Sequence, residues 1–151
     1  MVALIVASAF AIGVLLALQP PINAAMAAEL GNPFLAAIFS ITISLVLVAF
    51  AWMSLGNVAA KWSAIIALPW WVVLGGAAGA FFVAGGILVA PQIGVALFIV
   101  CVIAGQLVGA AVADHFGAFG VAERALSWPR LIGIGLVLSG VALVQWSSHS
   151  S

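Results

Sequence analysis

The stretch from Pro33 to Met53 reads PFLAAIFSITISLVLVAFAWM and contains no charged side chain. A helix that crosses the hydrocarbon core of a bilayer needs about 20 mainly apolar residues, and this stretch has that length and composition. Its apolar residues are continuous, whereas the strands of a membrane barrel alternate polar and apolar residues. Because backbone groups in lipid must be hydrogen-bonded within the protein, the stretch is predicted to be a transmembrane helix.

The rest of the chain has the same character. Of its 151 residues, 68% are hydrophobic and 4% are charged, and the mean hydropathy is +1.45. Soluble domains have about 45–50% apolar and about 25% charged residues, so a soluble domain is excluded. The formal net charge of zero leaves no basic surface for nucleic acid, and disorder requires low hydrophobicity. The sequence therefore predicts an integral membrane protein whose surface contacts membrane lipid.

Charges and prolines divide the chain into five apolar stretches, and we expect them to form a single transmembrane domain over residues 1–151. The predicted spans cover about residues 2–26, 33–53, 69–90, 92–113 and 129–146. Four of them begin at a proline, which the first turn of a helix tolerates because its N–H has no partner to lose. The prolines are Pro33, Pro69, Pro91 and Pro129. The predicted fold class is all-α, with five transmembrane helices.

The basic residues predict an orientation. With five spans, the N-terminus and the loops after the second and fourth spans lie on one side of the membrane. Lys61, Arg124 and Arg130 are the three basic residues of the chain, and all of them fall on that side. Basic residues collect on the cytoplasmic side, so the N-terminus is predicted to be cytoplasmic and the C-terminus external.

The first span contains polar residues at depth, in the run Gln19-Pro20-Pro21-Ile22-Asn23. Two consecutive prolines remove two N–H donors and clash with the preceding turn, which predicts a helix break or kink here. Transporters use interrupted helices beside a cavity to contact their cargo. The alternative is a packed kink in which Gln19 and Asn23 form hydrogen bonds across helices.

Other polar residues lie in or near the later spans. Ser40 and Ser44 share one face of the second span, although serine hydroxyls also bond to carbonyls four residues earlier. Gln106 lies in the middle of the fourth span, where its alternative role is to join helices. Trp70 is either part of an aromatic substrate site or an interfacial anchor. The predicted substrate path consists of Gln19, Asn23, Ser40, Ser44, Trp70 and Gln106.

Titratable residues lie near the ends of the spans. Asp114 and His115 close the fourth span, and Glu29 lies after the first. They are candidates for proton transfer or gating, and the alternative for each is a role in capping a helix or loop. No charged residue falls in the middle of a span, where an exchanger of cations and protons would need a carboxylate. This absence favours neutral or zwitterionic cargo, or facilitated diffusion.

The sequence contains no pattern that predicts catalysis. It shows no pairing of a nucleophile with a base and no phosphate-binding loop, and nothing in it indicates a cofactor. The two histidines are far apart in the sequence, so no metal site is expected. We therefore do not expect an enzyme.

Several longer segments resemble a known family. They read QPPINAAMAAELGNPFLAAIFS, PWWVVLGGAAGAFFV, APQIGVALF, AGQLVGAAVADHFG and RLIGIGLVLSG. Together they resemble the small YdcZ-like branch of the bacterial drug/metabolite transporter (DMT) superfamily, over about residues 19–144. The resemblance implies a five-helix protein of the bacterial inner membrane, related to one half of the ten-helix transporters. It does not supply a substrate.

The resemblance also implies an oligomer, because larger members join two inverted halves around a central cavity. The partner would be a second copy in a homodimer, or an oppositely oriented paralogue in a heteropair. The bias of basic residues disfavours a chain that inserts both ways. The predicted function is a secondary transporter of a small metabolite or drug-like solute, working by alternating access. The alternatives are a non-transporting subunit that docks a partner protein, and a passive channel.

Overall fold

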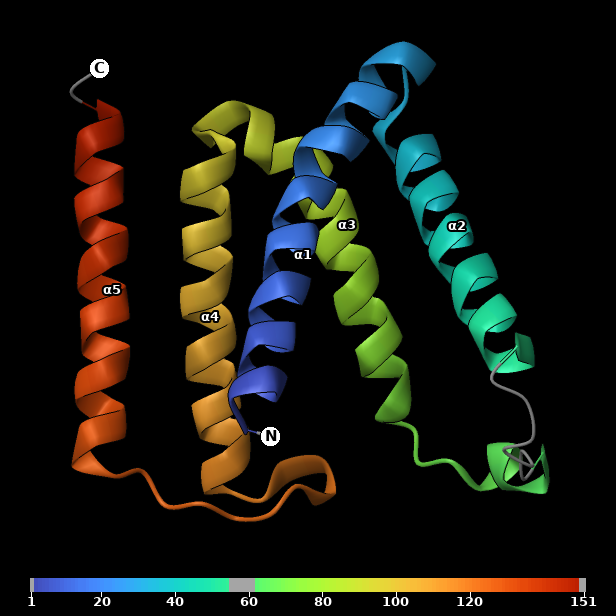
Figure 1. Ribbon diagram of the computed structural model, residues 1–151. Coiled ribbons are helices and arrows are strands. Elements are labelled where there is room, and N and C mark those ends of the chain that lie inside the picture. The colour runs from blue at the N-terminus through green and yellow to red at the C-terminus, as the bar shows by residue number, and fades with distance from the viewer. Residues whose placement is uncertain (1, 55–61, 150–151) are drawn as a thin grey trace. The chain divides into compact units, whose positions relative to one another are not determined.

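The computed structural model describes residues 2–54 and 62–149 and shows five long helices in them (Figure 1). They are α1 (Val2–Leu30), α2 (Pro33–Ser54), α3 (Val72–Ile93), α4 (Val95–His115) and α5 (Trp128–His149), with short 3-10 helices η1 (Trp62–Ala67) and η2 (Ala118–Gly120). Each of the five long helices is long and apolar enough to cross a membrane. The prediction of an all-helical, five-span protein is confirmed for the described residues. Lys61, used to predict the orientation, lies outside them.

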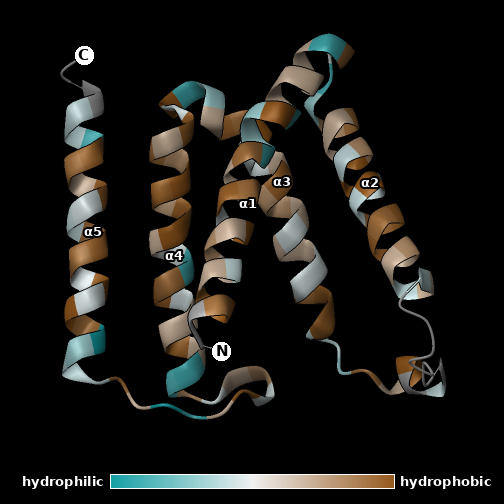
Figure 2. Cartoon of the chain, in the orientation of Figure 1, coloured by the Kyte–Doolittle hydropathy of each residue, from teal (hydrophilic) through white to brown (hydrophobic). Residues whose placement is uncertain are grey.

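The helices are apolar around most of their circumference. In Figure 2 hydrophobic residues run along all five long helices, and hydrophilic ones gather mainly near helix ends and in the connections. Large apolar side chains such as Phe10, Val48 and Leu143 are exposed on the helix surfaces. A helix that is apolar all round belongs in lipid or in the core of a large protein. This surface is therefore suited to lipid contact.

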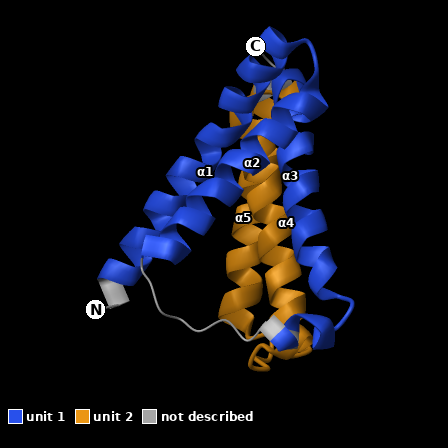
Figure 3. Cartoon of the chain, turned by 90° about the vertical axis from the view of Figure 1, so that its right-hand side faces the viewer, with its two compact units in different colours: residues 1–92 blue, residues 93–151 orange. Residues whose placement is uncertain are grey.

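The chain divides into two compact units, residues 1–92 and 93–151 (Figure 3). The first unit contains α1, α2 and α3, and α1 and α2 form a helical hairpin whose arms diverge away from the turn that joins them. The second unit contains α4 and α5, which also pack against each other. The expectation of a single transmembrane domain stays a prediction.

The turn between α1 and α2 contains three local signals in a row. Gly31 has a φ of 64°, a conformation that suits glycine at the end of a helix. The side-chain oxygen of Asn32 accepts hydrogen bonds from the N–H groups of Phe34 (2.9 Å) and Leu35 (3.0 Å), which caps α2. Pro33 occupies the first helical position, where its missing N–H costs nothing. This sequence therefore ends one helix and starts the next.

The buried core of the first unit lies near this turn. Ala36 and Ala37 of α2 pack with Val83 and Ile87 of α3, and all four are at most 8% exposed. Met26, Ala27 and Phe82 pack against this cluster. Small side chains let helix backbones approach closely, which is how helices associate when lipid is as apolar as their own surfaces. The core thus brings residues of all three helices of the unit together.

Of the break or kink predicted at Pro20 and Pro21, the structure shows no break, and the kink stays a prediction. Helix α1 continues through both prolines to Leu30. The two missing N–H groups deprive only the carbonyls of Leu16 and Ala17 of their usual partners. Breaking the helix would expose more backbone groups, and each unpaired group is costly in lipid. The helix therefore stays continuous.

The boundary between the third and fourth spans also differs from the expectation. Pro91 does not start the fourth span but lies inside the last turn of α3. Gly94, with a φ of 87°, separates the two helices, and its carbonyl accepts a hydrogen bond from the Phe98 N–H (3.0 Å). Glycine adopts this backbone conformation without the steric cost that a Cβ brings. The helix boundary thus follows the glycine rather than the proline.

We predict that Asn32→Ala destabilises the protein by about 1 kcal/mol, because two N–H groups at the start of α2 lose their cap. The measurement is reversible unfolding in mixed micelles, followed by circular dichroism. Asn32→Asp is the matched control, since its carboxylate can still accept both hydrogen bonds. Equal stability of Asn32→Ala and the wild type would contradict the capping role.

Candidate functional site

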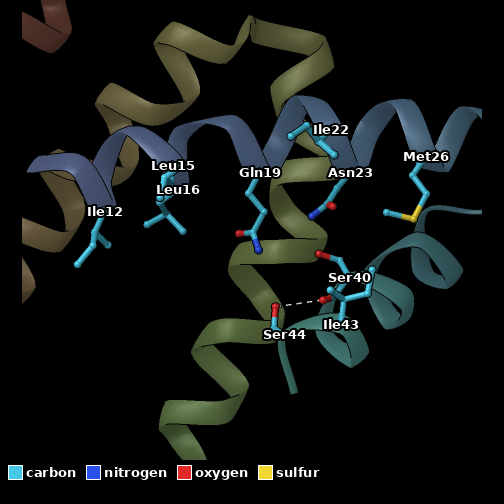
Figure 4. A pocket seen from close by; sticks show the side chains of 10 residues that line it. All are labelled: Ile12, Leu15, Leu16, Gln19, Ile22, Asn23, Met26, Ser40, Ile43 and Ser44. Carbon is cyan, nitrogen blue, oxygen red and sulfur yellow. Dashed lines mark hydrogen bonds between the residues drawn. The ribbon is translucent and has the colours of Figure 1, made fainter. Parts of the chain in front are cut away.

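A pocket of about 480 Å³ lies between α1 and α2, inside the first unit (Figure 4). Sites for small molecules have volumes of about 300–1,000 Å³, so the pocket has room for a small solute. The residues that line it are Ile12, Leu15, Leu16, Gln19, Ile22, Asn23, Met26, Ser40, Ile43 and Ser44. Six of these ten are apolar and none is charged.

The polar residues of the pocket face one another across the hairpin. Gln19 and Asn23 are four residues apart on α1, which places them on the same face of the helix. Both side chains point toward Ser40 and Ser44 on α2 (Figure 4). The structure thus brings together four of the six residues predicted for a substrate path.

Asn23 is the most deeply buried of these polar side chains. It is 3% exposed, and its Nδ2 has no hydrogen-bond partner within the described part of the chain. A buried donor without a partner costs about 1–3 kcal/mol. Because Asn23 lines the pocket, its unpaired amide is a candidate group for contacting a molecule there.

The hydroxyls of the two serines differ in their hydrogen bonds and in their burial. The Ser44 hydroxyl donates to the carbonyl of Ser40 at 3.1 Å, as the alternative interpretation of these serines anticipated. Its oxygen can still accept a hydrogen bond, because a hydroxyl carries two lone pairs. Ser40 is 8% exposed and lies opposite Asn23 (Figure 4). The α2 side of the pocket therefore presents hydroxyl oxygens.

The two prolines add backbone polarity to the α1 side. Pro20 is buried and Pro21 is half-buried, so both belong to the packed part of the hairpin. Because neither has an N–H, the carbonyls of Leu16 and Ala17 lack their normal helical donors. Leu16 is itself a lining residue. The carbonyls that lack a helical donor therefore lie in the same stretch of α1 as the lining residues Leu16 and Gln19.

Asp114, at the end of α4, is tied to two other segments of the second unit. Its carboxylate accepts a hydrogen bond from the Arg130 guanidinium at 2.5 Å, and this ion pair joins α4 to α5. Its carbonyl accepts the N–H of Arg124 at 2.7 Å, which fastens the connecting loop. Gly117 turns this loop with a φ of 58°, and a Cβ there would meet the Val121 carbonyl oxygen at 3.4 Å. Asp114 thus acts as a structural junction.

His115 takes no part in the ion pair between Asp114 and Arg130. Its ring lies edge-on to the ring of Phe116, with the centroids 4.9 Å apart. Its Nδ1 is buried and has no partner among the described residues. In the described structure the Asp114 carboxylate pairs with Arg130 rather than with His115. This arrangement favours the loop-capping interpretation of Asp114 over a direct Asp–His proton relay.

Residues 4–143 match the protein family described as "Putative inner membrane exporter, YdcZ". The chain belongs to this family. Searches of curated proteins and of solved structures found no match. The family assignment confirms the resemblance seen in the sequence, and together with the five apolar helices it identifies a multi-pass inner-membrane protein. It also supports a membrane transporter in general rather than an enzyme.

Besides Asp114 and His115, three candidate residues predicted from the sequence of this YdcZ-family chain lie outside the pocket lining. Trp70 is 77% exposed in the turn before α3, and Glu29 is exposed in the last turn of α1. Gln106 is exposed on α4, in the other compact unit. Their predicted roles in the path, and in gating for Glu29, stay predictions.

The pairing of Asp114 with Arg130 was not predicted from the sequence. Arg130 was used only to predict the orientation of the chain, although the two residues flank the same loop with opposite charges. In a chain with 4% charged residues, two opposite charges at the ends of successive apolar stretches are a usable signal. A charge near the membrane is costly without a partner, so such residues tend to pair.

We predict that Asp114 and Arg130 are coupled by about 1 kcal/mol, because both side chains are less than a third exposed. Asp114→Asn and Arg130→Gln should each lower the free energy of unfolding. The double variant should lose less than the sum of the two. A double-mutant cycle in mixed micelles measures the coupling, and strict additivity would show that the pair contributes nothing.

Proposed function

We propose that this YdcZ-family protein is a secondary transporter that moves a small metabolite or drug-like solute across the inner membrane. The observation that supports this function is the pocket between α1 and α2, where Gln19, Asn23, Ser40 and Ser44 gather in an otherwise apolar hairpin. Polar groups are expensive inside a membrane, so their concentration at one cavity points to contact with a solute.

We further propose that transport proceeds by alternating access in an oligomer. Secondary transporters place their binding sites at the interface of two structural repeats, and rocking of the repeats exposes the site to either side. This chain supplies five helices, and the pocket is walled by only two of them. A second copy or an oppositely oriented paralogue would supply the facing half.

The orientation belongs to the same proposal. Arg124 and Arg130 lie in or beside the loop between α4 and α5, and basic residues favour the cytoplasmic side. We therefore propose that the N-terminus lies in the cytoplasm and the C-terminus outside. A reporter fused to the C-terminus tests the assembly as well. A purely external signal supports a heteropair or a parallel homodimer, and a mixed signal supports an antiparallel homodimer.

The test of transport is uptake by proteoliposomes that contain the purified protein, using a pooled panel of metabolites with and without a proton gradient. We expect saturable uptake of at least one solute, and exchange between labelled and unlabelled solute. Exchange requires a carrier cycle, so its absence in a flux-competent protein would identify a passive channel. A stoichiometric partner protein together with no flux would identify a non-transporting subunit.

We predict that Gln19→Ala abolishes this uptake while expression and assembly persist, because the variant removes a polar side chain from the pocket. Gln106→Leu is predicted to have the same effect if the path extends to α4. Gln92→Leu is the control, since Gln92 lies outside the pocket and its amide donates to the Leu88 carbonyl at 2.6 Å. Unchanged uptake in Gln19→Ala would remove this residue from the path.

A further inference from the structure

The residues that line the α1–α2 pocket indicate which class of solute it binds. This inference rests on the proposed transport function. None of the described residues that line the pocket is charged. A charged solute that enters this cavity gives up part of its hydration and finds no opposite charge among these residues, which costs free energy. The lining therefore disfavours anions, cations and zwitterions alike.

The longest apolar part of the lining on α1 lies before Gln19, and Ile22 and Met26 add apolar side chains on either side of Asn23. Ile12, Leu15 and Leu16 lie on the N-terminal side of Gln19, where they form an apolar stretch (Figure 4). The amides of Gln19 and Asn23 follow, opposite the serines of α2. A solute that matches this lining has a hydrogen-bonding group that faces the amides and serines, and an apolar chain that lies along the apolar stretch.

The buried amide of Asn23 specifies part of that hydrogen-bonding group. Its Nδ2 is a donor, it lies in a side chain that is only 3% exposed, and it has no partner within the described residues. A neutral oxygen on the solute, in a carbonyl, hydroxyl or ether, would accept its hydrogen bond. The free lone pairs of the serine oxygens could in turn accept a donor from the same solute.

We propose that this pocket binds an uncharged amphipathic solute and that Asn23 recognises it by donating a hydrogen bond to an oxygen at its polar end. Neutral amides and alcohols with an apolar chain are the chemical class that fits. This proposal goes beyond a general transport function, because it specifies the charge state of the cargo and the residue that forms a hydrogen bond with its polar group.

Three probes, each with six carbon atoms, test the charge preference: hexanamide is neutral, hexanoate is an anion and hexylammonium is a cation. The reporter is Ser44→Cys in a Cys101→Ser background, in the full chain embedded in nanodiscs. Ser44 lines the pocket and is accessible, so its cysteine should react with N-ethylmaleimide, and intact mass measures the rate. A bound solute slows this reaction.

We expect hexanamide to protect the cysteine in a saturable way, and the two charged probes to give no protection at the same concentration. Adding Asn23→Leu should raise the hexanamide concentration for half-protection by about fivefold, as expected for one lost hydrogen bond. Adding Gln92→Leu, which removes an amide outside the pocket, should leave it unchanged. Comparing one probe between variants cancels its partitioning into lipid.

A second variant keeps the test decisive if Asn23→Leu does not fold. Asn23→Asp has nearly the same shape but places a carboxylate in the pocket, so protection should pass from hexanamide to hexylammonium. The proposal is overturned if hexanamide gives no saturable protection, if a charged probe protects the wild-type pocket equally well, or if Asn23→Leu and Asn23→Asp leave the preferences unchanged.

The outcome for this site is separable from the outcome for transport. Flux of a charged metabolite that is insensitive to Asn23→Leu would leave the transporter standing and overturn the recognition of a neutral solute. Asn23-dependent protection by hexanamide, combined with no flux of any solute in proteoliposomes, would keep the binding site and overturn the transport function.

Discussion

The hydrogen bonds of the backbone determine most of what this protein can be. In the hydrocarbon core no water is present to satisfy an N–H or a carbonyl, so each segment must satisfy its own groups. The continuous helix through Pro20 and Pro21 shows how strong the constraint is, because two lost donors do not end it. Helices end where the chain offers an inexpensive replacement, as at Gly31 and Gly94, whose positive φ values suit glycine.

The same constraint gives meaning to the few polar side chains. Ser8, Thr42 and Ser139 donate to carbonyls four residues earlier on their own helices, which satisfies their hydroxyls locally. Asn23 differs because it is buried and its Nδ2 has no partner in the described structure. A polar group that the protein leaves unpaired at depth is more informative about function than one that is satisfied within its own helix.

Much of the fold could be predicted from the sequence because the signals are local. Apolar length identified five helices, and Asn32-Pro33 marked the start of α2 through chemistry contained in adjacent residues. The boundary after Pro91 could not be placed, because a proline is compatible with the first turn of a helix and also, with one carbonyl left unpaired, with its last turn. The positive φ of Gly94 sets the boundary, and this backbone angle cannot be known from the sequence alone.

The candidate site was predictable in part for the same reason. Gln19 and Asn23 share a helix face by their spacing alone, and Ser40 and Ser44 do likewise. That these two pairs face each other depends on the register of α1 against α2, which is set by the turn and by the packing of small residues such as Ala36. The pairing of Asp114 with Arg130 depends on how a loop folds back, so the sequence showed the charges without joining them.

The two walls of the pocket are consecutive in the chain, and this affects how the protein is made. All of its lining residues fall between Ile12 and Ser44. The helices that carry them end at Ser54, so the residues of the site are complete before the remaining three helices have been synthesised. Contacts between neighbouring segments form with little loss of chain entropy. The residues that line the cavity are therefore all synthesised before α3, α4 and α5.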